Sequence, residues 1–206
     1  MAFKYNPEAQ SKYTPESTNF LVGITKEQLL SLATDKSGEY KIRLLPPWSS
    51  EGIYAKQGLI HYKLGADAKG NFICPNMHEA GSCLFCNVYG QLRSEYEKFK
   101  VDLQVISAKR RYYSNALDLN MVTKGVLVFS FGIKIYKFFE KYQQSGDYGD
   151  ITDLKEGRNL TVSRTVEGKS ITDIVMVNPK TSDISDSIDD SMLHNLDGVL
   201  PEPDLD

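Results

Sequence analysis

Long apolar runs are missing from this sequence of 206 residues. No stretch approaches the roughly 18 consecutive apolar residues that a membrane-spanning helix requires. Residues 1–5 also lack the apolar segment of a secretory signal. We therefore expect a cytoplasmic protein with no membrane partner.

Catalytic signatures are missing as well. The glycines form neither a P-loop nor a dinucleotide-binding pattern, and the sequence supports no pair of nucleophile and base. With 41% hydrophobic and 25% charged residues, the composition is ordinary for a soluble domain that can bury a core. The sequence therefore indicates a binding module and not an enzyme.

Basic residues are absent from one end of the chain. From Thr181 onward there is no Lys or Arg, whereas seven Asp and one Glu give this stretch a charge of −8. The whole chain carries −3, so residues 1–180 carry +5. We expect a flexible N-terminal arm at 1–20, a mildly basic body at 21–180, and an acidic C-terminal tail at 181–206 in which His194 is solvated.

Cysteine is scarce, and the spacing of the three cysteines is informative. Cys83 and Cys86 form a C-x2-C pair that can hold one tetrahedral metal ion from a single tight loop, and Cys74 precedes it by nine residues. For the fourth ligand we favour His61, which lies at the base of the loop, over His78 inside it. The resulting Cys3His set predicts one structural Zn²⁺.

Two other interpretations of the cysteines are open. They can be free thiols packed as small hydrophobic groups. They can also belong to a catalytic zinc site, since nucleobase deaminases combine H-x-E with P-C-x-x-C. Here His78 and Glu79 are adjacent and Ser82 stands at the proline position, so this pattern fits poorly.

The apolar periodicity predicts a mainly β (α+β) fold. Helical spacing occurs at 24–30, from Val88 to Phe99, and from Gly132 to about Tyr142. About five strands with an interposed helix suggest a five-stranded OB-fold barrel, with helical insertions and a small zinc-binding subdomain at about 61–100. The strands are predicted at 40–45, 53–64, 111–119, 125–131, 160–164 and 174–177.

Cations and aromatic residues alternate at two places, as in proteins that bind unpaired nucleic acid through phosphates and bases. The candidate contacts are Lys109, Arg110, Arg111, Tyr112, Tyr113, Lys134, Tyr136 and Lys137, with Arg43 and Lys63 in addition. Twelve Tyr and nine Phe exceed what one site needs, so most of the aromatic rings belong to the core. A basic run at the start of a strand is also often just a solvated edge.

These residues resemble the T-even-type bacteriophage single-stranded DNA-binding (helix-destabilising) protein family. The resemblance extends from about Tyr40 to Val177 and rests on the zinc pattern and on two segments, 109–117 and 131–136. It implies an OB core with a zinc subdomain, a basic cleft, and coating of transient single-stranded DNA in replication, recombination and repair. It also implies that the acidic tail recruits phage replication and recombination proteins in the cytoplasm of the infected host.

The chain departs from the family pattern in several ways. The Cys74–Cys83 interval is one residue shorter, and Phe129 and Ser130 stand where a Tyr and an Arg are expected. The N-terminal arm has few basic residues, so we expect at most weak self-association on DNA. A zinc-containing RNA-binding or transcription accessory protein is the alternative function.

The acidic tail offers two further expectations. Its negative charges can occupy the basic cleft when DNA is absent, so that deleting residues 181–206 would tighten DNA binding. Its apolar residues suit partner recognition, and these are Leu193, Leu196, Val199 and Leu200.

Overall fold

The computed structural model describes residues 21–64, 70–77, 82–95 and 102–200. Two compact units divide the chain, a smaller one within residues 59–109 and a larger one made of residues 23–58 and 110–201. The predicted N-terminal arm at 1–20 lies outside the described residues.

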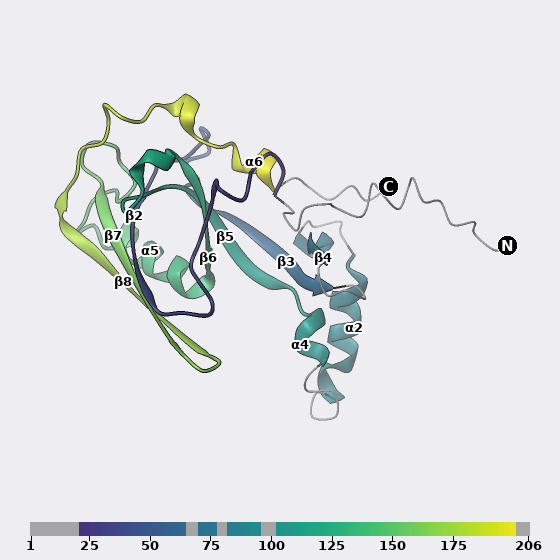
Figure 1. Ribbon diagram of the computed structural model, residues 1–206. Helices are drawn as coiled ribbons and strands as arrows, with labels where there is room; N and C mark the ends of the chain where they lie inside the picture. Colours follow the sequence, from purple (N-terminus) through teal and green to yellow (C-terminus); the bar gives the residue numbers. More distant parts are fainter. Residues whose placement is uncertain (1–20, 65–69, 78–81, 96–101, 201–206) are drawn as a thin grey trace. The chain divides into compact units, whose positions relative to one another are not determined.

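Six strands follow one path through the sheet, in the order β1-β6-β5-β2-β7-β8 (Figure 1). All neighbours on this path are antiparallel except β1 and β6, which are parallel. The strands are β1 (Leu29–Ser31), β2 (Gly38–Leu44), β5 (Lys109–Asp118), β6 (Leu127–Gly132), β7 (Arg158–Glu167) and β8 (Ser170–Thr181).

Helix α5 (Ile133–Ser145) begins where β6 ends and packs against β6 and β8 (Figure 1). It ends at Gly146, which adopts the left-handed conformation at φ 75° that glycine tolerates best. Its apolar side places Ile135 and Phe139 in the core, both without exposed surface. Strand residues complete this core, namely Ile42, Leu44, Tyr112, Ala116, Phe129, Phe131, Leu160, Val162 and Val175.

The sheet does not close into the predicted five-stranded barrel. β6 pairs with β5 and β1, and no ladder joins β6 to β8 within the described ranges. Instead, the Tyr142 hydroxyl of α5 donates a hydrogen bond of 3.0 Å to the Val175 carbonyl of β8. The fold is therefore a mixed α+β one, dominated by an open eight-stranded sheet with few helices.

The smaller unit is built on an antiparallel pair of strands, β3 (Lys56–Leu64) and β4 (Gly70–Ile73). A Cβ atom at Gly70 would lie 2.6 Å from the Leu64 carbonyl oxygen, so the close approach of the two strands requires glycine there. The helical elements are η1 (Pro75–Met77), α2 (Leu84–Leu92), η2 (Arg93–Glu95) and α4 (Asp102–Ile106).

The sequence predicted most strands correctly but misassigned the segment at 24–30. Thr25 and Gln28 bond each other's backbone amides through their side chains, as in a helix capping box. No α-helix follows, because Leu29 and Leu30 pair with β6 as β1. The prediction of a helix there is wrong, since sheet pairing overrides a local capping signal.

The acidic C-terminal stretch is also different from the prediction. Its described part, here called the C-terminal segment (residues 182–200), belongs to the larger unit and includes the 3-10 helix η4 (Asp190–Met192) and the short α-helix α6 (Leu196–Val199). Leu196 and Leu200 have no exposed surface. The segment is therefore part of the folded unit and not a free tail, and these leucines are not available to a partner.

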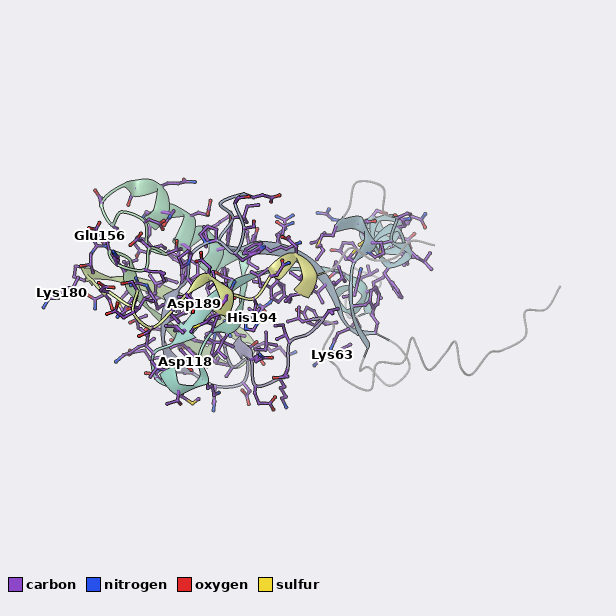
Figure 2. All side chains as sticks on the ribbon, turned by 90° about the horizontal axis from the view of Figure 1, so that it is seen from above. Lys63, Asp118, Glu156, Lys180, Asp189 and His194 are labelled. Carbon is purple, nitrogen blue, oxygen red and sulfur yellow. The ribbon has the colours of Figure 1, made fainter. Side chains whose placement is uncertain are left out.

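His194 fixes the C-terminal segment to β5 and to the loop after it (Figure 2). Its backbone N–H and C=O pair with the Asn115 side-chain amide, each at 2.9 Å. Its ring Nε2 lies 3.1 Å from the Val126 carbonyl oxygen. The prediction that His194 is solvated is therefore wrong. The acidic sequence around His194 gave no sign of its three polar contacts with Asn115 and Val126.

Between β5 and β6, the 3-10 turn η3 (Val122–Lys124) completes the larger unit. Met121 and Val122 are exposed there, whereas Leu127 at the start of β6 is buried. The turn therefore marks the point at which the hairpin leaves the core.

Candidate metal centre and nucleic-acid surface

Four predicted ligands come together in the smaller unit. The ligand atoms of His61, Cys74, Cys83 and Cys86 all lie within 4.8 Å of one another. Cys74 Sγ is 3.4 Å from Cys86 Sγ, and His61 Nε2 is 3.2 Å from Cys83 Sγ and 3.7 Å from Cys86 Sγ. An ion bound at about 2.3 Å from sulfur and about 2.0 Å from nitrogen sets tetrahedral ligands about 3.5–3.8 Å apart. The cluster therefore fits a metal site.

The ligands come from the β3–β4 hairpin and from the start of α2. His61 lies on β3, opposite Phe72 of β4. Cys74 follows β4 directly, and Cys83 is the N-cap of α2, where its own amide donates 2.7 Å to the Asn76 side chain. Cys86 lies within the first turn of α2. The C-x2-C motif thus marks the start of a helix, and the hairpin supplies the other two ligands.

Aromatic rings surround the histidine ligand. Phe72 stacks on the His61 ring with centroids 5.0 Å apart, and Phe85 lies 5.5 Å from it. Phe72 and Phe85 also contact each other at 5.6 Å. His61 consequently has no exposed surface, and its Nε2 atom is directed at the sulfur atoms. The alternative ligand His78 lies outside the described residues.

Burial disfavours charge at this cluster. It raises the pKa of Cys74 to about 12, and it also raises the pKa of Cys86. Burial lowers the pKa of His61, although the Ile106 backbone acts in the opposite direction. Two packed thiols would therefore stay protonated near neutral pH without a cation, and a bound metal ion is what can stabilise their thiolates.

The candidate phosphate contacts of the larger unit meet where β5 begins and α5 begins. Arg111 of β5 is opposite Gly132, the N-cap of α5. Arg110, Lys134 and Lys137 are exposed. The first turn of α5 contains no acidic residue. The antiparallel β5–β6 pair therefore brings two distant basic segments of the sequence to one end of the sheet.

Tyr136 of α5 lies parallel to Tyr112 of β5, with ring centroids 3.9 Å apart and 4° between the planes. Tyr112 is 5% exposed, and its hydroxyl donates 3.2 Å to Gln57. Tyr136 remains partly exposed, and burial together with Glu140 raises its pKa to about 12. Tyr112 thus covers one face of the Tyr136 ring, and its own burial leaves it little surface for a ligand.

Two predicted nucleic-acid contacts are incompatible with their positions. Tyr113 is 1% exposed and Arg43 has no exposed surface. The Arg43 guanidinium donates to the Asp153 carbonyl, and the loop at Gly157 leaves no space for a Cβ atom beside it. Both predictions are corrected: β5 is buried on both faces from Tyr112 to Leu117, and Arg43 holds the loop that follows α5.

Lys63 and Lys109 belong to the smaller unit, and both are exposed. Lys63 has a φ of 56°, which is uncommon for a residue other than glycine, and its amide donates 3.0 Å to Asn71. Lys109 Nζ donates 2.6 Å to Ser107. The two lysines remain candidate phosphate contacts of that unit.

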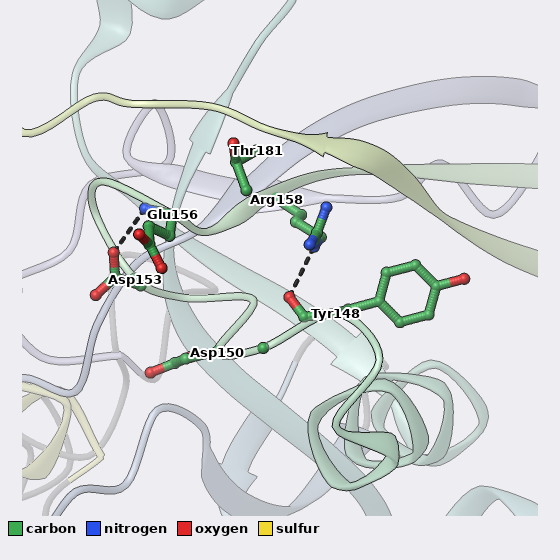
Figure 3. A pocket seen from close by; sticks show the side chains of 7 residues that line it. Tyr148, Asp150, Asp153, Glu156, Arg158 and Thr181 are labelled. Atoms are coloured by element: carbon green, nitrogen blue, oxygen red, sulfur yellow. Dashed lines mark hydrogen bonds between the residues drawn. The ribbon is translucent and has the colours of Figure 1, made fainter.

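A pocket in the larger unit has the wrong charge for nucleic acid. Asp150, Asp153, Glu156 and Arg158 are among its lining residues (Figure 3). The Asp153 carboxylate accepts 2.7 Å from the Glu156 amide, and Arg158 Nε donates 2.7 Å to the Tyr148 carbonyl. These groups stabilise the turn between α5 and β7, and three carboxylates repel phosphate.

No model of a protein family matches the sequence, and no curated protein is significantly similar to it. Within the described ranges, no helix has the length and apolar character needed to cross a membrane.

Proposed function

We propose that this protein binds single-stranded DNA and coats transient single strands in replication, recombination and repair, as its resemblance to the T-even-type phage family implies. The observation that carries the proposal is the Tyr136 ring, stacked on Tyr112 at 3.9 Å, on the same helix as the exposed Lys134 and Lys137. A flat ring beside cations suits an unpaired base and its phosphates, and stacking contributes about 1–3 kcal/mol per base.

The connectivity of the larger unit supports an OB-type module. β2 lies between β5 and β7, and β6 and β8 extend from these two strands. α5 separates β6 from β7 in sequence and places Ile135 and Phe139 in the core. A five-stranded, partly open barrel with this role for its helix is the OB arrangement. We infer that the α5 contact with β8 takes the place of the missing β6–β8 ladder.

For the metal centre we propose one structural Zn²⁺. Three sulfur ligands and one imidazole favour zinc, and four protein ligands leave no position for a substrate or water. The ion would hold the β3–β4 hairpin against the start of α2. Metal analysis of the purified chain should give one zinc per molecule. A zinc ion with an open coordination position, as in a catalytic site, would contradict the proposed set of four protein ligands.

A fluorescence titration with oligo-dT, compared with duplex DNA, tests the proposed function. If Lys109, Arg110, Arg111, Lys134 and Lys137 each contact a phosphate, the slope of log K against log salt should be about −3.5. Tyr136→Leu should weaken binding. Tyr148→Leu should not, because Tyr148 follows the C-terminal end of α5, after Gly146. A preference for duplex or a flat salt response would overturn the proposal. Competition by RNA of matched sequence tests the RNA-binding alternative.

A further inference from the structure

Arg111 is held in one orientation by the strand next to it. Its Nη2 atom donates to the Ser130 carbonyl at 3.3 Å and to the Ser130 hydroxyl at 3.2 Å. Ser130 is 5% exposed and belongs to β6, so it is a rigid acceptor. A guanidinium bonded through one nitrogen to two oxygen atoms of the same residue loses much of its rotational freedom.

The other end of the guanidinium is directed toward the start of α5. A Cβ atom placed on Gly132 would be 3.8 Å from Arg111 Nη1, so Nη1 lies beside the N-cap of the helix. Within the part of the chain that the structure describes, no carboxylate forms an ion pair with Arg111. In contrast, Arg164 of β7 is neutralised by both carboxylate oxygens of Asp173.

We propose that Ser130 is a positioning residue: it fixes Arg111 so that the free edge of the guanidinium receives a nucleic-acid phosphate at the start of α5. This inference rests on the proposed single-stranded DNA-binding function. A fixed cation to which the described residues offer no carboxylate retains its charge for an anionic ligand, and its donors need no reordering when the phosphate arrives. Ser130 carries no charge itself. Its two oxygen atoms hold the positive charge of Arg111, which belongs to the neighbouring strand β5, close to Ser130 on β6.

Charge and orientation can be separated by substitution in the full chain. Arg111→Gln removes the cation, so oligo-dT binding should weaken and the salt slope should become shallower by about 0.7. Ser130→Ala removes only the hydroxyl acceptor. It should weaken oligo-dT binding about 3- to 10-fold, as expected for the loss of one ordinary hydrogen bond while the Ser130 carbonyl still accepts from Arg111, and the salt slope should stay unchanged.

A double-mutant cycle distinguishes positioning from a general structural effect. In the Arg111→Gln background, Ser130→Ala should have no further effect on binding, and the melting temperature of Ser130→Ala should match the wild type. Ser163→Ala on β7 is the matched control and should leave binding unchanged. Additive effects of the two substitutions, or full affinity in Ser130→Ala, would overturn the positioning role and leave the proposed function intact.

A readout without DNA separates the two possible failures. Side-chain ¹⁵N NMR of Arg111 should show slow guanidinium rotation in the wild type and faster rotation in Ser130→Ala. Equal rotation in both proteins would contradict the fixation. If the wild type fails to bind oligo-dT at all, the proposed function is wrong, and the phosphate role of Arg111 is wrong with it, even where the NMR shows a fixed guanidinium.

Discussion

The two units of this protein are stabilised by different means. In the larger unit, thirteen buried residues from five strands, α5 and neighbouring loops form one apolar cluster. In the smaller unit, the buried apolar residues within the described ranges include Ile60, Leu64 and Leu103, and the other buried side chains are potential metal ligands. A core of this small size rarely supports a fold, so we propose that the smaller unit depends on a metal ion bound at this cluster.

Removing one metal ligand should produce the largest effect. Cys83→Ser should abolish stoichiometric metal binding and unfold the smaller unit, because structural zinc contributes about 10–16 kcal/mol in zinc-finger peptides. Hydrogen exchange resolved by peptide should show loss of protection at β4 and α2, with β7 and β8 still protected. His78→Asn is the matched control and should retain the metal; loss of metal in this control would restore His78 as a ligand.

The C-terminal segment extends the same comparison, because we assign it to the unit that depends on its core. Leu200 has no exposed surface, so Leu200→Ala should destabilise the larger unit by about 2–5 kcal/mol. Met192 of the same segment is 48% exposed, and Met192→Ala should change stability by less than about 0.5 kcal/mol. Urea denaturation measures both variants.

A deletion tests the segment as a whole. Removing residues 182–206 should lower the midpoint of urea unfolding, since it exposes the apolar surface around Leu45 and Leu117 that packs against Ile188. The charge pattern alone predicted a different result, namely tighter DNA binding after deletion of residues 181–206. Tighter binding would mean that the segment occupies the DNA-binding surface and is displaced when DNA binds.

The cluster of four candidate metal ligands could be predicted from the sequence because its spacing signal is local. The C-x2-C spacing fixes two ligands on one turn, and β3 and β4 bring His61 and Cys74 to them. The strands around α5 were also predictable, because alternation and the Phe-Gly break before Ile133 are properties of the local sequence. Such signals need no knowledge of distant partners.

The errors have one physical cause, which is that burial depends on what covers a residue. Arg43 and Tyr113 are a cation and an aromatic ring near other such residues, and nothing in their own segments reveals that the structure covers them. His194 was misjudged for the same reason, because Asn115 is 79 residues away in sequence. Composition describes a segment, whereas exposure is determined by long-range packing.

Substitution of Arg43 and of Lys134 compares the roles of a buried and an exposed cation in the larger unit. Arg43→Gln should destabilise the larger unit by about 1–3 kcal/mol, because a buried acceptor loses its charged donor, and it should leave the salt slope of oligo-dT binding unchanged. Lys134→Gln should do the reverse, with unchanged stability and a slope shallower by about 0.7. A slope change in Arg43→Gln would return Arg43 to the set of phosphate contacts.

The smallest effect is expected at the polar end of the C-terminal segment. Asp197 accepts hydrogen bonds from Lys56 and from the Trp48 indole, and these bonds lower its pKa below the ordinary 3.8. A lowered pKa in the folded state means that Asp197 stabilises the fold above its unfolded pKa and loses this contribution as the pH falls through the folded value.

Because the Asp197 side chain is 54% exposed, Asp197→Asn should cost no more than about 1 kcal/mol at pH 7. Urea unfolding at a series of pH values should show the variant and the wild type converging as the pH falls through the lowered pKa of Asp197, below the ordinary 3.8. Asp186→Asn provides an exposed control in the same segment and should leave the urea midpoint at pH 7 unchanged. A difference between Asp197→Asn and wild type that persists at low pH would mean that the segment is held here by packing, as at Leu200, and not by charge.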